Sequence, residues 1–232
     1  MSLKNIKLST PEYDDKIPST GKKVKITPFR VGDEKTLLIA AQSENGRQMI
    51  AALKSVIKNC VKGIDVEELA PYDLEYLFIK LRAKSVGETA TIGIACQSCE
   101  VTNELPVDLT TVQVSENKNK SNLIKIEDNL AFKMKYPEAD DIVDIDLNDP
   151  ASIMKVIALT VEQVYHGEEV IDIDPSDGED LIALIESMTS AQFEKLQDFF
   201  LNMPKVYKEI TFTCGSCGHE NEIKLEGLAS FF

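Results

Sequence analysis

The chain has 232 residues, a net charge of −14 at pH 7 and a sequence pI near 4.6. Hydrophobic residues make up 43% and charged residues 28%, which excludes an intrinsically disordered chain. No apolar run reaches the about 18 residues that span a bilayer, and the amino terminus lacks the apolar stretch of a secretory signal. Because nucleic acids and anionic membranes repel so acidic a surface, we expect a globular cytosolic protein that binds neither.

The first ninety residues predict a strand followed by three helices. Residues 22–27 alternate polar and apolar side chains, which is typical of a half-buried strand. Asp33 is a candidate N-cap for the first helix. Its inward side chains are expected to be Leu37, Leu38 and Ala41. Apolar residues at three- and four-residue spacing define the next two helices. They are Ile50, Leu53, Ile57 and Cys60 in one helix, and Leu74, Leu77, Phe78 and Leu81 in the helix that Pro71 opens.

The middle of the chain predicts β structure. Its strand-like segments are residues 88–95, 101–107, 123–126 and 130–136. Residues 127–129 supply a turn, so the last two segments should form a hairpin. Residues 115–122 are polar and lysine-rich, and they predict a surface loop.

The segment from residue 140 to residue 204 is helical in character. We expect one helix over residues 153–166, ended by Gly167, because its apolar residues fit a single buried face. These residues are Val156, Ile157, Val161, Val164 and Tyr165. Residues 172–178 form a turn-rich acidic linker.

Two further helices and a terminal hairpin complete the predicted elements. One helix begins at Glu179 and presents apolar side chains to the core, and the next follows a capping box made by Thr189 and Gln192. The inward residues are Leu181, Leu184, Ile185 and Met188 in the first, and Phe193, Leu196, Phe200 and Met203 in the second. Residues 209–213 and 222–225 are strand-like.

These elements predict an α+β fold, in which zinc-ribbon-like β hairpins from the middle and the end of the chain pack with several helices. We expect five segments that form one or two compact units. They are an extended amino-terminal segment (1–32), a helical region (33–87), the first cysteine pair with β hairpins (88–139), a second helical region (140–205) and the second cysteine pair with the carboxyl-terminal tail (206–232).

Four of the five cysteines form two Cys-x-x-Cys pairs, Cys96 with Cys99 and Cys214 with Cys217. Each pair lies between two strand-like stretches, as in zinc knuckles, where a two-residue gap lets both thiolates face one ion. Two facing hairpins would complete a tetrahedral shell of four thiolates. The sequence therefore predicts a structural Zn²⁺ site with these four ligands, because a closed shell leaves no position for a substrate.

Other uses of the cysteine pairs stay open. A thioredoxin-like redox motif usually opens a helix, which neither pair does. A rubredoxin-type iron site uses similar knuckles, and two separate disulfides would need an oxidising compartment. Cys60 stands on the apolar face of a helix, and we interpret it as a buried core residue.

No catalytic constellation is visible. The sequence lacks a Gly-rich phosphate loop, a Ser/His/Asp set and a His-Glu-x-x-His motif. We interpret His166 and His219 as surface residues. The acidic clusters miss calcium-loop spacing and are interpreted as solvated turns. They comprise Asp140, Asp141, Asp144 and Asp146, and Asp172, Asp174 and Asp177. We therefore expect no enzyme activity and no small-molecule substrate.

Several stretches are similar to those of a known family. They are residues 17–23, 28–29, 73–78, 81–88, 199–200, 203–205, 214–217 and 225–232. The run Leu-Arg-Ala-Lys-Ser-Val-Gly-Glu at 81–88 is the most distinctive, and residues 101–180 are the least similar. Together with both cysteine pairs, these stretches resemble the baseplate hub protein family of T4-like contractile-tailed bacteriophages.

The resemblance implies a non-enzymatic structural or assembly protein whose partners are other baseplate hub or tail proteins. It implies a place in the host cytoplasm during assembly. Members could stay in the virion or act as tail assembly chaperones, for example for the tape-measure protein. A nucleic-acid-binding zinc ribbon is the alternative from the knuckles alone, and the acidic balance opposes it. Candidate contact elements are residues 80–88 and the tail formed by Phe231 and Phe232, unless that tail is buried in its own core.

Overall fold

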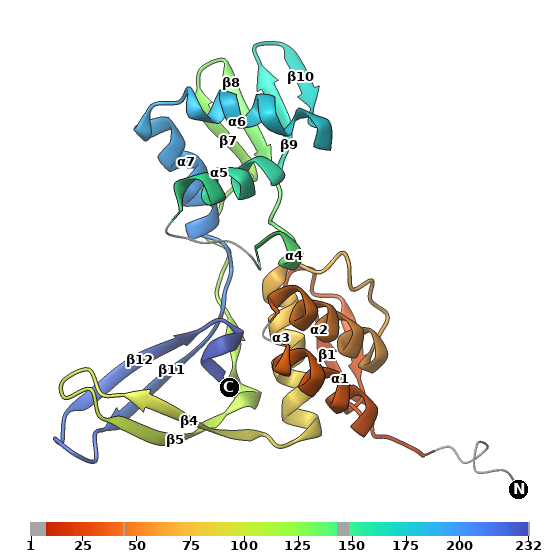
Figure 1. Ribbon diagram of the computed structural model, residues 1–232, viewed down its shortest axis with the longest axis vertical. Coiled ribbons are helices and arrows are strands. Elements are labelled where there is room, and N and C mark those ends of the chain that lie inside the picture. The colour runs from red at the N-terminus through yellow and green to blue at the C-terminus, as the bar shows by residue number, and fades with distance from the viewer. Residues whose placement is uncertain (1–7, 44, 143–148, 232) are drawn as a thin grey trace, which may run out of the picture. The chain divides into compact units, whose positions relative to one another are not determined.

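The computed structural model describes residues 8–43, 45–142 and 149–231 (Figure 1). The chain divides into two compact units. The first unit combines Met1–Val114 with Lys205–Phe232, and the second consists of Ser115–Pro204. Both contain helices and antiparallel sheets, which confirms the α+β class.

The first unit contains three helices and three small sheets among its described residues. Its helices are α1 (Val31–Gln42), α2 (Gly46–Cys60) and α3 (Pro71–Ser85). Its strands are β1 (Tyr13–Lys16), β2 (Lys23–Ile26), β3 (Val61–Lys62), β4 (Thr89–Ala95), β5 (Thr102–Asp108), β6 (Gln113–Val114), β11 (Val206–Thr213) and β12 (Glu220–Glu226). The sheet orders are β1-β2-β3, β4-β5 and β12-β11-β6, and every pairing is antiparallel.

Helix α3 is the most deeply buried helix of this unit. The predicted stripe of Leu74, Leu77, Phe78 and Leu81 is buried, as three- and four-residue spacing requires. Each such side chain stabilises the fold by about 1.5–3 kcal/mol through its removal from water. Phe231 is fully buried too, so the alternative that it packs into its own core is confirmed for this residue; Phe232 lies outside the described residues.

The prediction for α1 was wrong at its start and on its inward face. The N-cap is Arg30, and Asp33 occupies the third helical position, where its carboxylate accepts from the Arg30 amide at 3.0 Å. Leu38 is 58% exposed, and Ala40 is buried in place of Ala41. Apolar residues surround this helix without a helical period, so the sequence pattern could not select the face that packs.

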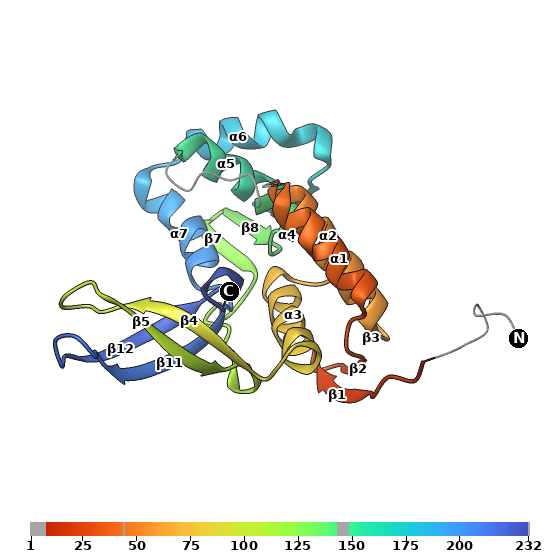
Figure 2. The same cartoon turned by 60° about the horizontal axis from the view of Figure 1, so that its bottom comes forward.

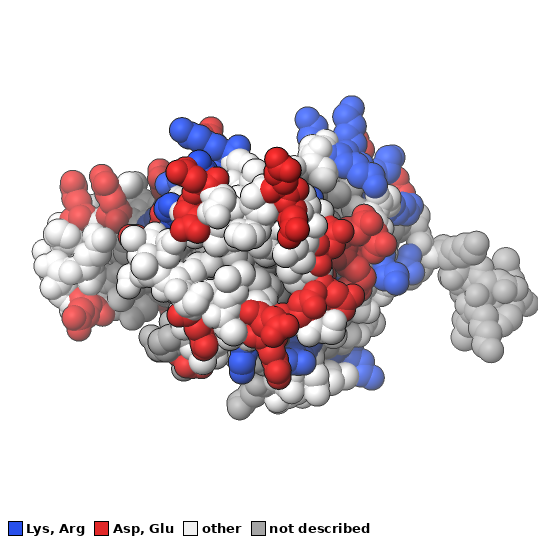
Figure 3. All heavy atoms as spheres, turned by 90° about the horizontal axis from the view of Figure 1, so that it is seen from above, with Lys and Arg blue, Asp and Glu red and all other residues white. Residues whose placement is uncertain are grey.

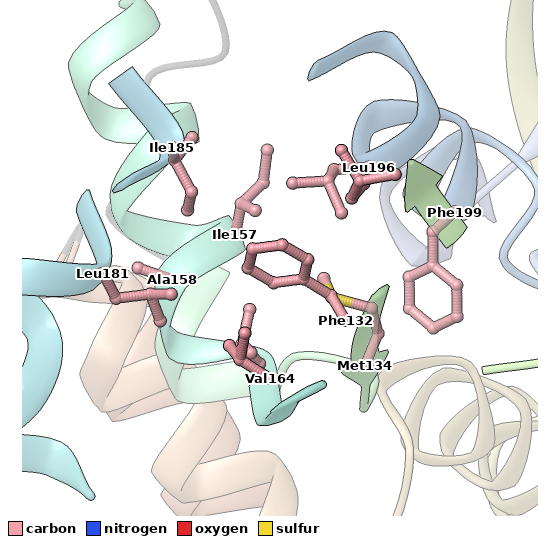
Figure 4. Packing of buried hydrophobic residues seen from close by; sticks show 11 residues of the cluster. Phe132, Met134, Ile157, Ala158, Val164, Leu181, Ile185, Leu196 and Phe199 are labelled. Carbon is pink, nitrogen blue, oxygen red and sulfur yellow. The ribbon is translucent and has the colours of Figure 1, made fainter. Parts of the chain in front are cut away.

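The second unit is a four-stranded antiparallel sheet with helices on it. Its strands are β7 (Leu123–Glu127), β8 (Leu130–Met134), β9 (Val161–His166) and β10 (Glu169–Asp172), in the order β10-β9-β8-β7. Its helices are α4 (Ala139–Ile142), α5 (Pro150–Leu159), α6 (Gly178–Glu186) and α7 (Ser190–Leu201). Figure 4 shows the core between them, with Phe132 of β8 next to Ile157 of α5 and Val164 of β9.

The predicted helix over residues 153–166 is wrong in its second half. Helix α5 ends at Leu159, and Val161–His166 is strand β9. Valine and tyrosine favour strands, and the residues of β9 pair with strand β8. This pairing with a distant segment overrides the helical pattern of the sequence. Gly167, with φ of 61°, lies in the tight turn that joins β9 to β10.

Other predictions for this unit are confirmed. The β7–β8 hairpin and the preceding loop occur where expected. The capping box of α7 is present, because the Thr189 hydroxyl accepts from the Gln192 amide at 3.3 Å while Gln192 accepts from the Thr189 amide at 2.8 Å. The acidic linker is shorter than expected, since its first residue, Asp172, ends β10.

Candidate metal centre

Two hairpins of the first unit carry the cysteine pairs in their loops. Strands β4 and β5 pair along their whole lengths, and so do β11 and β12 from Tyr207 to Thr213. Figures 1 and 2 show the two hairpins side by side, with their loops at the same end. We call residues 96–103 the first knuckle and residues 214–221 the second knuckle.

The four cysteine sulfurs of the knuckles converge. All four Sγ atoms lie within 4.8 Å of one another. The Sγ–Sγ distance is 3.7 Å between Cys96 and Cys217, and again 3.7 Å between Cys99 and Cys214. A tetrahedron with metal–sulfur bonds of about 2.3 Å has edges of about 3.8 Å, whereas a disulfide is about 2.05 Å long. The arrangement is therefore compatible with one tetrahedral metal ion.

The backbone of the first knuckle is repeated in the second. In each, the amide of the first cysteine donates to the carbonyl five residues later, at 3.0 and 2.8 Å. The carbonyl of that cysteine accepts from the amide four residues later, at 2.9 and 3.0 Å. The amide two residues after it lies 3.4 Å from its sulfur in both knuckles. Such amides stabilise thiolates and orient them toward an ion.

Two asparagines link the knuckles to each other. Asn221 accepts from the Gln97 amide at 2.8 Å, and Asn103 accepts from the Gly215 amide at 3.1 Å. Each side-chain amide also donates to the carbonyl two residues before it, at 3.0 and 2.9 Å. The Asn103 nitrogen lies 3.6 Å from the Cys214 sulfur as well. Each asparagine therefore stabilises the loop of the opposite knuckle.

The sequence interpretation missed these asparagines, although the signal was present. Both knuckles read Cys-x-Ser-Cys-x-x-x-Asn, so the asparagine stands four residues after the second cysteine in each. A search for repeats longer than the cysteine pair alone would have found it.

The four thiols have unequal proton affinities. Amides of Cys217 and Ser216 lower the pKa of Cys214 to about 6. The Val101 amide lowers the pKa of Cys99, but hydrogen bonds with the neighbouring thiols and burial together outweigh it. The net result is a pKa of about 12. Four thiols this close cannot all ionise without a cation, and a bound divalent metal would supply that charge.

The remaining candidate residues lie outside this cluster. Within the described ranges, the four cysteines are the one group of three or more His, Cys, Asp or Glu side chains close enough to share an ion. Asp144 and Asp146 fall outside those ranges. Cys60 is buried as expected, and burial followed by the nearby Asp33 raises the pKa of its thiol to about 11. His166 and His219 are exposed.

A cavity of about 620 Å³ lies in the second unit. Its described lining contains lysines, carboxylates and apolar residues, but no histidine, cysteine, serine or tyrosine. The described lining therefore lacks the side chains that most often serve as nucleophiles.

Comparison with known proteins decides the family. A family model described as T4 bacteriophage base plate protein matches residues 10–232. The chain belongs to this family. The match confirms the expected relationship to T4-like baseplate proteins, and it associates this base plate family protein with the bacteriophage tail and with other tail proteins. Neither the search of curated proteins nor the search of solved structures gave a match. In the described part of this protein, no helix is both long enough and apolar enough to cross a membrane.

Proposed function

We propose that the protein is a non-enzymatic structural or assembly component of the baseplate hub, held together by a structural Zn²⁺ ion. The proposed ligands are Cys96, Cys99, Cys214 and Cys217. The observation that carries the proposal is the convergence of their four sulfurs within 4.8 Å of one another, although the cysteine pairs are more than a hundred residues apart in sequence. An ion bound there joins the middle of the chain to its end.

The donor set favours a structural role for the metal. When bound, Zn²⁺ neutralises the thiolates and holds the two loops together. Four protein thiolates fill a tetrahedral shell, so no position is open for water or a substrate. The chain contributes orientation, because amides of both knuckles point to the sulfurs and the two asparagines fix the loops relative to each other.

The partners we propose are other hub or tail proteins. The net charge of −14 favours protein partners over nucleic acid. Figure 3 shows acidic side chains in several places, and lysines and arginines gathered elsewhere. Within the candidate contact segment 80–88, Val86 is 63% exposed and is the best placed apolar contact. Phe231 is buried and cannot serve in that way.

Metal analysis tests the zinc part. Protein purified without added metals is expected to contain one zinc ion per chain, as measured by inductively coupled plasma mass spectrometry. A Cys60→Ala variant should contain as much, because Cys60 is not in the cluster. Iron in place of zinc would reassign the ion, and metal-free protein with intact folding would reject the site.

Analysis of purified phage tails tests the hub part. We expect the protein among tail components, cross-linked to hub proteins in the baseplate. Its absence from mature tails, combined with its capture in assembly intermediates, would show a chaperone that acts in the host cytoplasm and would overturn the structural role.

A further inference from the structure

The sheet of the second unit has two edges of different character. At one edge, α7 lies against β7: Lys195 donates to the carbonyl of Ile126 at 2.6 Å, and Gln192 donates to Glu127 at 3.3 Å. At the other edge is β10, and no strand in the described part of the chain pairs with its outer side. Edge strands left open are templates for pairing with another chain.

The ladder with β9 fixes which backbone groups of β10 face outward. The Ile173 amide donates to the Glu162 carbonyl at 3.0 Å, in the same register as the β9–β10 pairs. Because hydrogen-bonded and non-bonded pairs alternate in an antiparallel ladder, Val170 and Asp172 direct their N–H and C=O groups away from β9. No described residue accepts from these two amides.

The side chains of β10 give this edge both apolar surface and charge. All four residues of the strand are exposed, with Val170 at 52% and Ile171 at 48%. Val170 lies opposite Tyr165 on one face of the sheet, and Ile171 lies opposite Val164 on the other. Acidic residues surround this apolar pair. They are Glu168, Glu169, Asp172 and Asp174.

We propose that the outer edge of β10 binds an extended segment of a partner protein as an added strand. The segment should carry β-branched residues beside Val170 and Ile171, and lysine or arginine beside the flanking carboxylates. Backbone hydrogen bonds supply affinity in this mode, and side-chain contacts supply specificity. The inference goes beyond the zinc-bound hub protein, because it does not depend on the metal.

Charge disfavours a second copy of this chain as the occupant. Two copies of β10 would pair antiparallel about a two-fold axis. Every alignment that places their outward-facing residues opposite one another also places one acidic residue opposite another. The opposed pairs are Asp172 with itself, Glu168 with Asp172, or Glu168 with Asp174. Like charges directly opposite in a sheet are destabilising, whereas a basic strand gains from the same carboxylates.

A synthetic peptide with two central valines flanked by lysines (Lys-Lys-Val-Val-Lys-Lys) is a direct probe, used with the full-length protein, because adjacent valines face Val170 on one side of the sheet and Ile171 on the other. We expect it to bind, and we expect hydrogen exchange at the amides of Val170 and Asp172 to slow in its presence. A peptide with glutamate in place of lysine should not bind. Binding should weaken as salt is added, since the carboxylates are exposed.

Three variants separate edge pairing from general attraction to an acidic protein. Val170→Pro removes an outward donor and leaves the inward bonds of Ile171, so affinity should fall about tenfold. Glu169→Lys should weaken binding about fivefold at low salt, whereas Glu186→Lys on α6, with the same change of charge, should leave it unchanged. The charge variants keep the test valid if Val170→Pro misfolds.

Four results would overturn the proposal. Equal losses in Glu169→Lys and Glu186→Lys would indicate unspecific attraction, and unchanged exchange at Val170 and Asp172 would place the peptide elsewhere. Self-association through β10 would make a second copy the occupant. Failure of the peptide to bind would mean that the acidic side chains only guard the edge against pairing.

Discussion

The first and second knuckles build the same loop from different sequences. Their backbone hydrogen bonds agree within 0.2 Å, as the paired distances of 3.0 and 2.8 Å and of 2.9 and 3.0 Å show. Only the serine before the second cysteine, the cysteines themselves and the final asparagine are shared. The residue after the second cysteine is left-handed in both, yet it is Glu100 with φ of 60° in one and Gly218 with φ of 73° in the other.

The two knuckles also differ in how deeply their asparagines are buried. Asn221 is 1% exposed, whereas Asn103 is only partly buried. Since each asparagine accepts from the opposite loop, neither knuckle is complete without the other. The comparison teaches that hydrogen bonds join two distant segments independently of the proposed ion, and that the bond accepted by Asn221 of the second knuckle is the more protected from water.

The largest expected effect is loss of one sulfur. Cys96→Ser and Cys214→Ser should each remove the metal and destabilise the first unit by several kcal/mol, because metal binding and folding of the loops are coupled, with binding energies of about 10 kcal/mol or more in small zinc domains. The two losses should be equal, since each knuckle supplies half of the shell. Metal content and urea unfolding measure both.

The double variant Cys96→Ser with Cys214→Ser sharpens this expectation. It should be no less stable than either single variant, because the first substitution already abolishes the site. Cys60→Ala is the control that removes a buried thiol and leaves the metal in place. Full metal occupancy in Cys96→Ser would contradict the four-ligand site, and additive losses would contradict the shared ion.

A smaller and unequal effect is expected from the asparagines. Asn221→Ala should reduce the free energy of unfolding by about 1–3 kcal/mol, because it leaves the Gln97 amide without its buried acceptor. Asn103→Ala should cost about 0.5–1.5 kcal/mol, since water can reach the Gly215 amide. Unfolding curves of the metal-loaded proteins measure the difference.

Exchange of metal to a chelator gives a second measure for the asparagine variants. Both should release the ion faster than the unsubstituted protein, Asn221→Ala the faster of the two, because the loops that orient the sulfurs are loosened. Asn129→Ala, at an exposed turn of the second unit, should change neither quantity beyond about 0.5 kcal/mol. Equal effects of the two knuckle variants would show that burial does not distinguish them.

The sequence was sufficient for features that local chemistry determines. Spacing of the cysteines and the strand-like stretches beside them predicted the hairpins, and the Thr189 capping box marked the start of α7. The stripe of α3 followed from its period, since all four of its predicted residues are buried. Each of these signals depends on residues a few positions apart.

The features that were missed depend on contacts between distant segments. Val161–His166 has helical spacing but becomes a strand because β8 pairs with it. Asn103 and Asn221 acquire their roles only when the opposite knuckle is in place, so a single hairpin does not reveal them. Helix α1 is apolar on several sides, and its packing on α2 rather than its own period decides which side is buried.

The smallest expected effects come from the left-handed residue of each knuckle. Gly218→Ala should reduce the free energy of unfolding by about 1 kcal/mol, because an L side chain is strained at positive φ. The cost is conformational alone, since a Cβ at Gly218 would meet no atom within 4 Å. Glu100→Gly should stabilise the protein by less than about 1 kcal/mol, because relief of strain is offset by the greater entropy of glycine in the unfolded chain.

Measured together by urea unfolding with metal bound, these two substitutions test whether the knuckles are equivalent at this position. Gly218→Ala makes the second turn resemble the first, which already tolerates a side chain at φ of 60°. Its metal content should therefore be unchanged. A loss of several kcal/mol, or of the ion, would show that the second knuckle needs glycine for more than its backbone angle. Destabilisation by Glu100→Gly of more than about 1 kcal/mol would show that the Glu100 side chain itself supports the first.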